Sequence, residues 1–219
     1  MSAVAFLFAA ALAAPPATPA PSGPFVQLDR IAAVVGDDVI LESEVKRLVE
    51  VRLLPRRADE TDAGYRDRVL EERIDELLRE SQLRRTGGLE PDPRDVEARL
   101  SELVKRVEAE RGLSFDAILL RARATKAEVS GWIKRGLTLE TYVRERISPT
   151  VKLTDAELTA YYEGPFRAEA KGKGLENLPP FAEVADELRE LLRERRLNEE
   201  IVRWTDSLRQ ATRIVVYRR

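Results

Sequence analysis

The sequence predicts a mainly α-helical protein in which a small β-sheet joins an N-terminal ribbon, residues 30–41, to a C-terminal strand, residues 213–218. Composition indicates the helical part, because 35% of the 219 residues are charged and only 11 are Gly and 12 are Pro. The stretch DRIAAVVGDDVILESEV at 29–45 indicates the ribbon, since two apolar runs flank a Gly-Asp-Asp turn. The closing RIVVYRR indicates the strand.

The ribbon and the last strand are expected to pair with each other. A two-stranded ribbon is marginal alone in water, so it needs a third strand or a helix as a neighbour. Residues 31–35 and 214–217 are apolar at every position, which is typical of strands covered on both faces. We therefore expect the two ends of the chain to close one domain.

Caps and helix breakers divide the region between these strands into helices. Thr125 and Thr154 each open a capping box, with Glu128 and Glu157 three residues later. Asp92 followed by Pro93 is a further start signal, and Gly112 a stop signal. The helices are expected from a Ser43 cap to Pro55, along a stripe from Leu70 to Leu83 that stops at Gly87-Gly88, from Asp92 to Gly112, over 114–123 with a Ser114 cap, from Thr125 to Ser148, from Thr154 to Tyr162, and from Phe181 to Leu208.

Charge and residue usage exclude several function classes. The 37 basic and 39 acidic residues are interspersed and give a net charge of −2, so no nucleic-acid partner is expected. The chain has no Cys and no His, which excludes disulfides, thiol nucleophiles, Ser-His triads and thiolate or imidazole metal sites. Asp37-Asp38 reads as a turn and Gly172-x-Gly174 as a flexible linker rather than a phosphate loop. We expect no enzyme activity, no cofactor and no metal site.

Residues 1–24 have the pattern of a signal peptide followed by a Pro/Ala spacer. The apolar run Ala3 to Ala14 has 12 residues, which is too short to span a bilayer, and Ala11-Leu12-Ala13 has the form of a cleavage site. No Lys or Arg precedes the run, so a disordered apolar leader is the alternative. The sequence therefore predicts export to the periplasm or beyond, with no integral membrane span in the mature chain.

Three apolar side chains are candidates for contact with a partner polypeptide. The short helix over 114–123 has little sequence nearby to cover it, so Phe115, Leu119 and Trp132 are the preferred lining of an apolar cleft between helices. The alternative is that these residues are ordinary core, as most large apolar side chains in helical proteins are.

The order of these segments resembles the SurA-type periplasmic chaperones, relatives of the PrsA and PpiD foldases. LDRIAAVVGDDVILESEV resembles the opening of their chaperone domain, and RVLEERIDELLRESQLRR its second helix. VKLTDAELTAYYE resembles the segment that leads into their parvulin prolyl isomerase domain, and the stretch from LPPFAEV to RIVVY the helix and strand that follow it. Only 16 residues lie between Tyr162 and Pro179, so the isomerase domain is expected to be absent.

The resemblance implies one helical chaperone module made of two parts. Residues 25–162 form the first part, 163–179 a linker that replaces the parvulin domain, and 180–219 the helix and strand that complete the module. The implied function is an ATP-independent holdase for unfolded exported or outer-membrane proteins. The alternative is a non-catalytic adaptor that binds one folded envelope partner. A concave apolar surface favours the holdase, whereas a flat, mixed-charge surface favours the adaptor.

Overall fold

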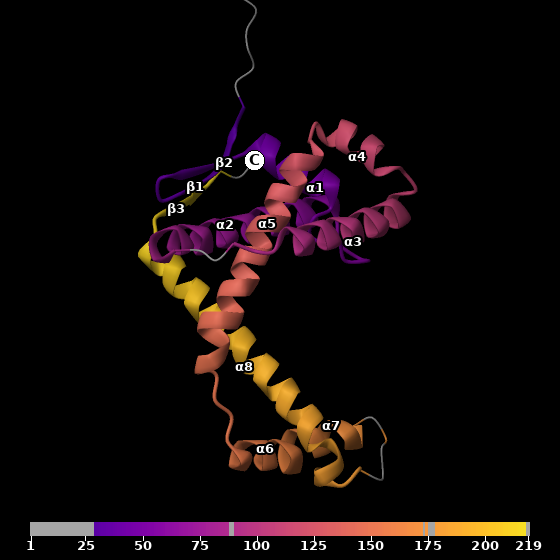
Figure 1. Ribbon diagram of the computed structural model, residues 1–219, viewed down its shortest axis with the longest axis vertical. Coiled ribbons are helices and arrows are strands. Elements are labelled where there is room, and N and C mark those ends of the chain that lie inside the picture. Colours follow the sequence, from indigo (N-terminus) through magenta and orange to yellow (C-terminus); the bar gives the residue numbers. More distant parts are fainter. Residues whose placement is uncertain (1–28, 88–89, 173, 175–177, 218–219) are drawn as a thin grey trace, which may run out of the picture.

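The protein consists of a larger upper body and a smaller lower lobe, joined by two long helices (Figure 1). The computed structural model describes residues 29–87, 90–172, 174 and 178–217, so the expected signal peptide lies outside the described residues. The elements are β1 (Ile31–Val35), β2 (Asp38–Leu41), α1 (Glu42–Val51), α2 (Asp62–Thr86), α3 (Pro93–Arg111), α4 (Phe115–Ala122), α5 (Lys126–Tyr142), the π-helical turn η1 (Val143–Ile147), the 3-10 turn η2 (Ser148–Thr150), α6 (Asp155–Tyr161), the π-helical turn η3 (Tyr162–Phe166), α7 (Arg167–Gly172), α8 (Phe181–Ala211) and β3 (Ile214–Val216).

The sheet joins the two ends of the described chain, as the sequence predicts. Its strand order is β2-β1-β3 and both pairings are antiparallel, with Ala33 opposite Val216 and Val35 opposite Ile214. Gly36 occupies the β1–β2 turn at φ +60°, a conformation that favours glycine, and its N–H donates to the carbonyl of Arg213 at 2.9 Å. β1 is the central strand, which explains why it is apolar on both faces.

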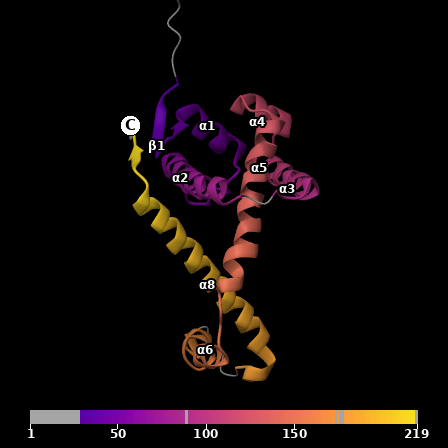
Figure 2. The same ribbon diagram turned by 60° about the vertical axis from the view of Figure 1, so that its left-hand side comes forward.

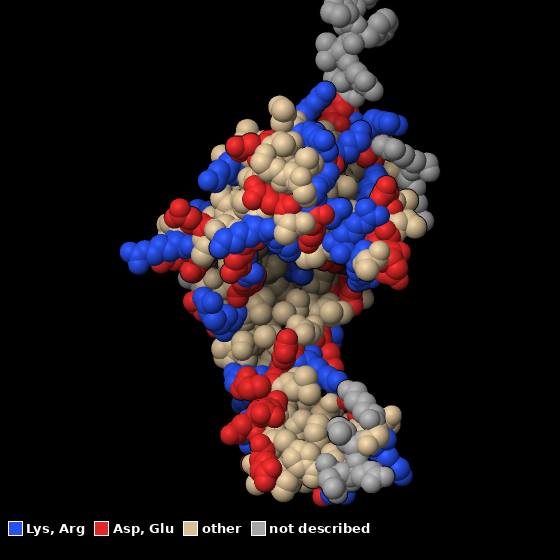
Figure 3. Space-filling view, turned by 90° about the vertical axis from the view of Figure 1, so that its right-hand side faces the viewer, with Lys and Arg blue, Asp and Glu red and all other residues tan. Residues whose placement is uncertain are grey.

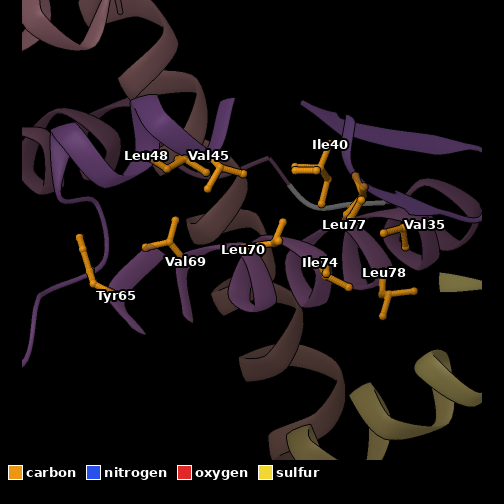
Figure 4. Packing of buried hydrophobic residues seen from close by; sticks show 12 residues of the cluster. Val35, Ile40, Val45, Leu48, Tyr65, Val69, Leu70, Ile74, Leu77 and Leu78 are labelled. Atoms are coloured by element: carbon orange, nitrogen blue, oxygen red, sulfur yellow. The ribbon is translucent and has the colours of Figure 1, made fainter. Parts of the chain in front are cut away.

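A first buried cluster fills the space between the sheet, α1 and α2. Leu70, Ile74, Leu77 and Leu78 of α2 belong to this cluster, and all four are buried (Figure 4). This is the helical stripe that the sequence predicts between Leu70 and Leu83. The sheet and the first two helices are therefore one packed unit.

A second buried cluster lies between α3, α4 and α5 and contains Val51 from the end of α1. Trp132 on α5 is half-buried and packs against both the first and the second cluster. The sheet and α1 to α5 together form the upper body. Figure 2 shows α4 and α3 beside the upper half of α5.

The lower lobe consists of α6, η3, α7 and the first half of α8 around a third cluster. Leu158, Tyr162 and Leu188 are buried there, and the Tyr162 ring stacks on Phe166 with 5.7 Å between ring centroids. The Tyr162 hydroxyl donates to the carbonyl of Pro179 at 2.7 Å. The linker expected over 163–179 is thus helical as far as Gly172, because Phe166 stacks on Tyr162, which in turn packs edge-on against Phe181 of α8.

Most of the predicted helix limits are confirmed, with two differences in α1. Ser114, Thr125 and Thr154 cap their helices, and both capping boxes are formed. Ser43, in contrast, lies inside α1, and its backbone N–H donates to the carboxylate of Asp29 at 3.2 Å. Hydrogen bonds from the side chain and the backbone of Ser43 together lower the pKa of Asp29. Helix α1 also ends at Val51, before Pro55, because Arg52 adopts a left-handed conformation with φ 52°.

Candidate functional site

The three side chains proposed from the sequence for partner contact lie in or against the buried clusters. Phe115 is 6% exposed and Leu119 is 8% exposed, both within the second cluster. Helix α4 packs against α1 and α3, so the expectation that little covers it is wrong. The exposed apolar residue of this helix is Leu120, which is 81% exposed.

The structure offers a different apolar surface, at the waist between the upper body and the lower lobe. We use waist for residues 139–151, which form the lower end of α5 with η1 and η2, together with residues 197–204 of α8. Figure 3 shows that the molecule is hollowed below the upper body and that the surface there is mostly free of charged side chains. Eight apolar side chains of the waist are half-buried and belong to none of the three buried clusters; they are Leu139, Tyr142, Val143, Ile147, Val151, Leu197, Ile201 and Trp204. Val202, in the same segment of α8, is 58% exposed.

An aromatic pair holds the two helices of the waist together. Tyr142, the last residue of α5, stacks on Trp204 of α8 with 5.5 Å between ring centroids and 27° between ring planes. Such pairs contribute about 0.5–1.5 kcal/mol beyond the area that they bury. Next to Trp204, Thr205 is buried and its hydroxyl donates to the Ile201 carbonyl at 2.8 Å, which removes an unpaired polar group from this contact.

Two arginines of α8 fix the helix above and below the waist. Above it, Arg209 contacts Asp75 at 2.5 Å and Glu71 at 2.9 Å, and both carboxylates lie on α2. Below it, Arg196 pairs with Glu157 of α6 and donates to the carbonyl of Lys152 at 2.7 Å. The Arg196 hydrogen bond is the main reason that the pKa of Glu157 is lowered to about 2, so this pair stays ionised over the physiological pH range. The apolar surface is therefore held between two polar anchors.

A small groove of about 160 Å³ lies between α2 and α5 at the upper edge of the waist. Leu139 and Gly136 line its α5 side. Its α2 side is charged and includes Glu76 and Glu80. The waist thus changes from apolar to charged where it meets the upper body.

Those charges belong to a network that ties α1, α2 and α5 together. Arg73 on α2 is only 9% exposed and contacts Glu44 of α1 at 2.7 Å, Glu80 at 3.0 Å and Glu76 at 3.4 Å. Arg135 on α5 contacts Glu80 at 3.1 Å. Burial raises the pKa of Glu76. These partly buried carboxylates are held by Arg73 and Arg135 where α1, α2 and α5 meet.

Replacing Arg73 by methionine is expected to destabilise the protein by about 3–5 kcal/mol at neutral pH, because Glu44 and Glu76 lose a buried cation. The loss should be smaller at about pH 4.5 than at about pH 7.5, as measured by urea unfolding. The pKa of Glu76 is already raised in the folded state, so this carboxyl binds its proton more tightly there than in the unfolded chain, and acidification favours the fold. Without the positive charge of Arg73 the pKa of Glu76 rises further, which increases this effect of pH.

Arg84→Met on the same helix is the control for this measurement. Arg84 is exposed and pairs with the exposed Asp38, so its loss should cost less than about 1 kcal/mol and show little dependence on pH. Equal losses for the two variants at both pH values would contradict the role of Arg73.

The acidic pair Asp37-Asp38, which the sequence assigns to a turn, has a structural role. Asp37 and Asp38 lie at the β1–β2 turn, as predicted, and Asp38 pairs with Arg84 at 2.8 Å. Within the described ranges, no group of three or more Asp or Glu side chains is placed to hold a metal ion. No described helix combines the length and the apolar character that crossing a membrane requires.

No protein-family model matches the chain, and no curated protein matches it.

Proposed function

We propose that the protein is an ATP-independent holdase that binds unfolded polypeptides at the waist. The observation that carries this proposal is the set of half-buried apolar side chains that lies outside every buried cluster, at the height where the molecule is hollowed below the upper body (Figure 3). Apolar side chains that lie near one another and stay partly accessible to solvent are typical of surfaces that bind other polypeptides. An extended client segment that covers the waist would remove these side chains from water.

The waist is suited to capture without a cofactor. Binding of an unfolded chain at an apolar surface lowers the concentration of free client and so slows its aggregation, and this needs no energy source. The anchors at Arg209 and Arg196 keep α8 in place above and below the contact surface. A surface that is already ordered loses less conformational entropy when it binds.

We further propose that the protein is a SurA-type module without the parvulin domain and that it acts in the periplasm after cleavage of its signal peptide near Ala13 or Ala20. The pairing of β3 with β1 supports this, because the resemblance implies that the last helix and strand return to the first part of the module. On this proposal, α6, η3 and α7 occupy the place in the chain where the family has its isomerase domain.

Serine substitutions at the waist test the holdase function. The variant Ile147→Ser/Leu197→Ser/Ile201→Ser removes three half-buried side chains that belong to no buried cluster, so it should stay folded. Each lost contact with a client is worth about 1 kcal/mol, so the three together should weaken client binding roughly a hundredfold. The measurement is light scattering of an unfolded outer-membrane β-barrel protein diluted from urea, without ATP, at rising chaperone concentration.

The control variant is Ile31→Ser/Val39→Ser/Leu120→Ser, which removes three exposed apolar side chains outside the waist. It should suppress aggregation as well as the wild type does. Circular dichroism and the melting temperature check that both variants are folded. If the wild-type protein protects no unfolded client, the holdase function is wrong and the adaptor function replaces it. If the two variants lose protection equally, the waist is not the binding surface.

A further inference from the structure

A groove of about 750 Å³ lies in the upper body between α1, the start of α2 and the end of α4. Five basic side chains line it: Lys46, Arg47, Arg66, Arg121 and Arg123. Two acidic side chains, Glu50 and Asp62, also line it, and Val49 and Ala122 add apolar surface. A volume of this size is in the range that holds a ligand or a short peptide segment.

The acidic side chains of this groove are already neutralised. Glu50 pairs with Arg111 at 2.6 Å, and Asp62 pairs with Arg56 at 2.7 Å. Neither of these arginines lines the groove. The negative charges are therefore compensated from outside the groove.

Two of the five basic side chains form ion pairs, and the other three do not. Arg47 contacts Glu128 at 3.4 Å, and Arg66 contacts Glu42 at 2.5 Å. Lys46, Arg121 and Arg123 are exposed and form no ion pair with any residue that the structure describes. The groove thus presents three uncompensated positive charges beside an apolar patch.

We propose that this groove binds an acidic segment of a partner protein, with Asp or Glu side chains opposite Lys46, Arg121 and Arg123. Apolar side chains of the same segment would pack on Val49 and Ala122. This binding is separate from the waist and does not depend on the holdase function.

Charge selects this occupant over the alternatives. Residues 1–28 contain no Asp or Glu, so that segment of the chain itself lacks the required charge. A nucleic acid would bring closely spaced phosphates against Glu50 and Asp62, which lie in the same groove. A peptide can place its carboxylates opposite the three cations and neutral residues opposite the two acids.

The experiment measures the fluorescence anisotropy of a dye-labelled peptide of alternating glutamate and leucine, titrated with the full chain. The groove variant Lys46→Gln/Arg121→Gln/Arg123→Gln should bind about tenfold more weakly, since three exposed ion pairs are lost. Binding to the wild type should also weaken when NaCl rises from about 0.05 M to about 0.5 M. A peptide with glutamine in place of glutamate should not bind.

The matched control is Arg94→Gln/Lys105→Gln/Lys126→Gln, which makes the same change in net charge at exposed positions outside the groove. It should bind the peptide as the wild type does, and so should the waist variant, so a failure of the holdase function leaves this test intact. Equal weakening in the groove variant and in this control would overturn the proposal, as would no binding to the wild type. Sedimentation with phosphatidylglycerol but not phosphatidylcholine vesicles, without binding of the peptide, would assign the groove to a lipid headgroup and also overturn it.

Discussion

Replacing Leu119 by serine is expected to destabilise the protein by about 2–5 kcal/mol, whereas the same replacement at Leu120 should change its stability by less than about 0.5 kcal/mol. The two residues are neighbours on α4, but Leu119 is 8% exposed within the second cluster and Leu120 is 81% exposed. The serine at 119 leaves a cavity and a hydroxyl among apolar side chains. Urea unfolding of the two variants measures the difference.

The triple variant Phe115→Ser/Leu119→Ser/Trp132→Ser should be largely unfolded. Loss of a buried aromatic side chain costs about 3–5 kcal/mol, and the three losses together approach the whole stability of a typical domain, about 5–15 kcal/mol. Trp132 packs against both clusters of the upper body, so its loss weakens both. A triple variant that stays folded but no longer protects clients would instead support the contact role that the sequence suggests for these residues.

The difference between Leu119 and Leu120 shows what the sequence can predict at this site. The apolar residues of 114–123 identify a helix, and the Ser114 cap is confirmed. Which face of so short a helix is covered depends on α1 and α3, which come from distant parts of the chain. Local spacing carries no information about that packing.

The waist could not be predicted from the sequence either, because its exposure also depends on packing between distant parts of the chain. Leu197, Ile201 and Trp204 continue the helical stripe of the longest helix, and a stripe of this kind normally predicts core. Their half-burial results from the position of α8, whose two ends pack on different lobes while its middle crosses the end of α5 and η1. The way α5 and α8 cross determines how exposed these side chains are, and the sequence of one helix alone does not predict that crossing.

The sheet, in contrast, is predicted almost completely. β1 and β3 are apolar at every position, and strands of that kind need neighbours, so their pairing follows from residue type alone. The turn at Gly36 follows from the chemistry of the Gly-Asp-Asp sequence. The helical segment over 163–172 is not predicted, because its Gly and Lys content indicates a loop, whereas Tyr162 and Phe166 order it through contacts with α8.

Deleting residues 212–219 is expected to destabilise the protein by about 3–5 kcal/mol and to promote aggregation. The deletion removes Ile214 and Val216, which pack against the first cluster, together with the hydrogen bond from the Tyr217 N–H to the carbonyl of Ala32 at 2.9 Å. It also turns β1, whose Ala33 and Val35 are buried, into an exposed edge strand. Exposed apolar edges pair readily with other chains. Thermal unfolding followed by light scattering detects both effects.

Point substitutions in the intact chain separate the packing of β3 from the loss of chain length. Val216→Asp places a carboxylate against the first cluster and should reproduce most of the instability, because burying an unpaired charge is costly. Tyr217→Asp, one residue later, introduces the same charge at a side chain that is 51% exposed and should leave the melting temperature nearly unchanged. Raising the pH should worsen Val216→Asp, because its carboxyl is less costly to bury when it is protonated. If the deletion and Val216→Asp both melt like the wild type, then α8 is held by Arg209 and the lower lobe alone, and the sheet is not what joins the two ends of the chain.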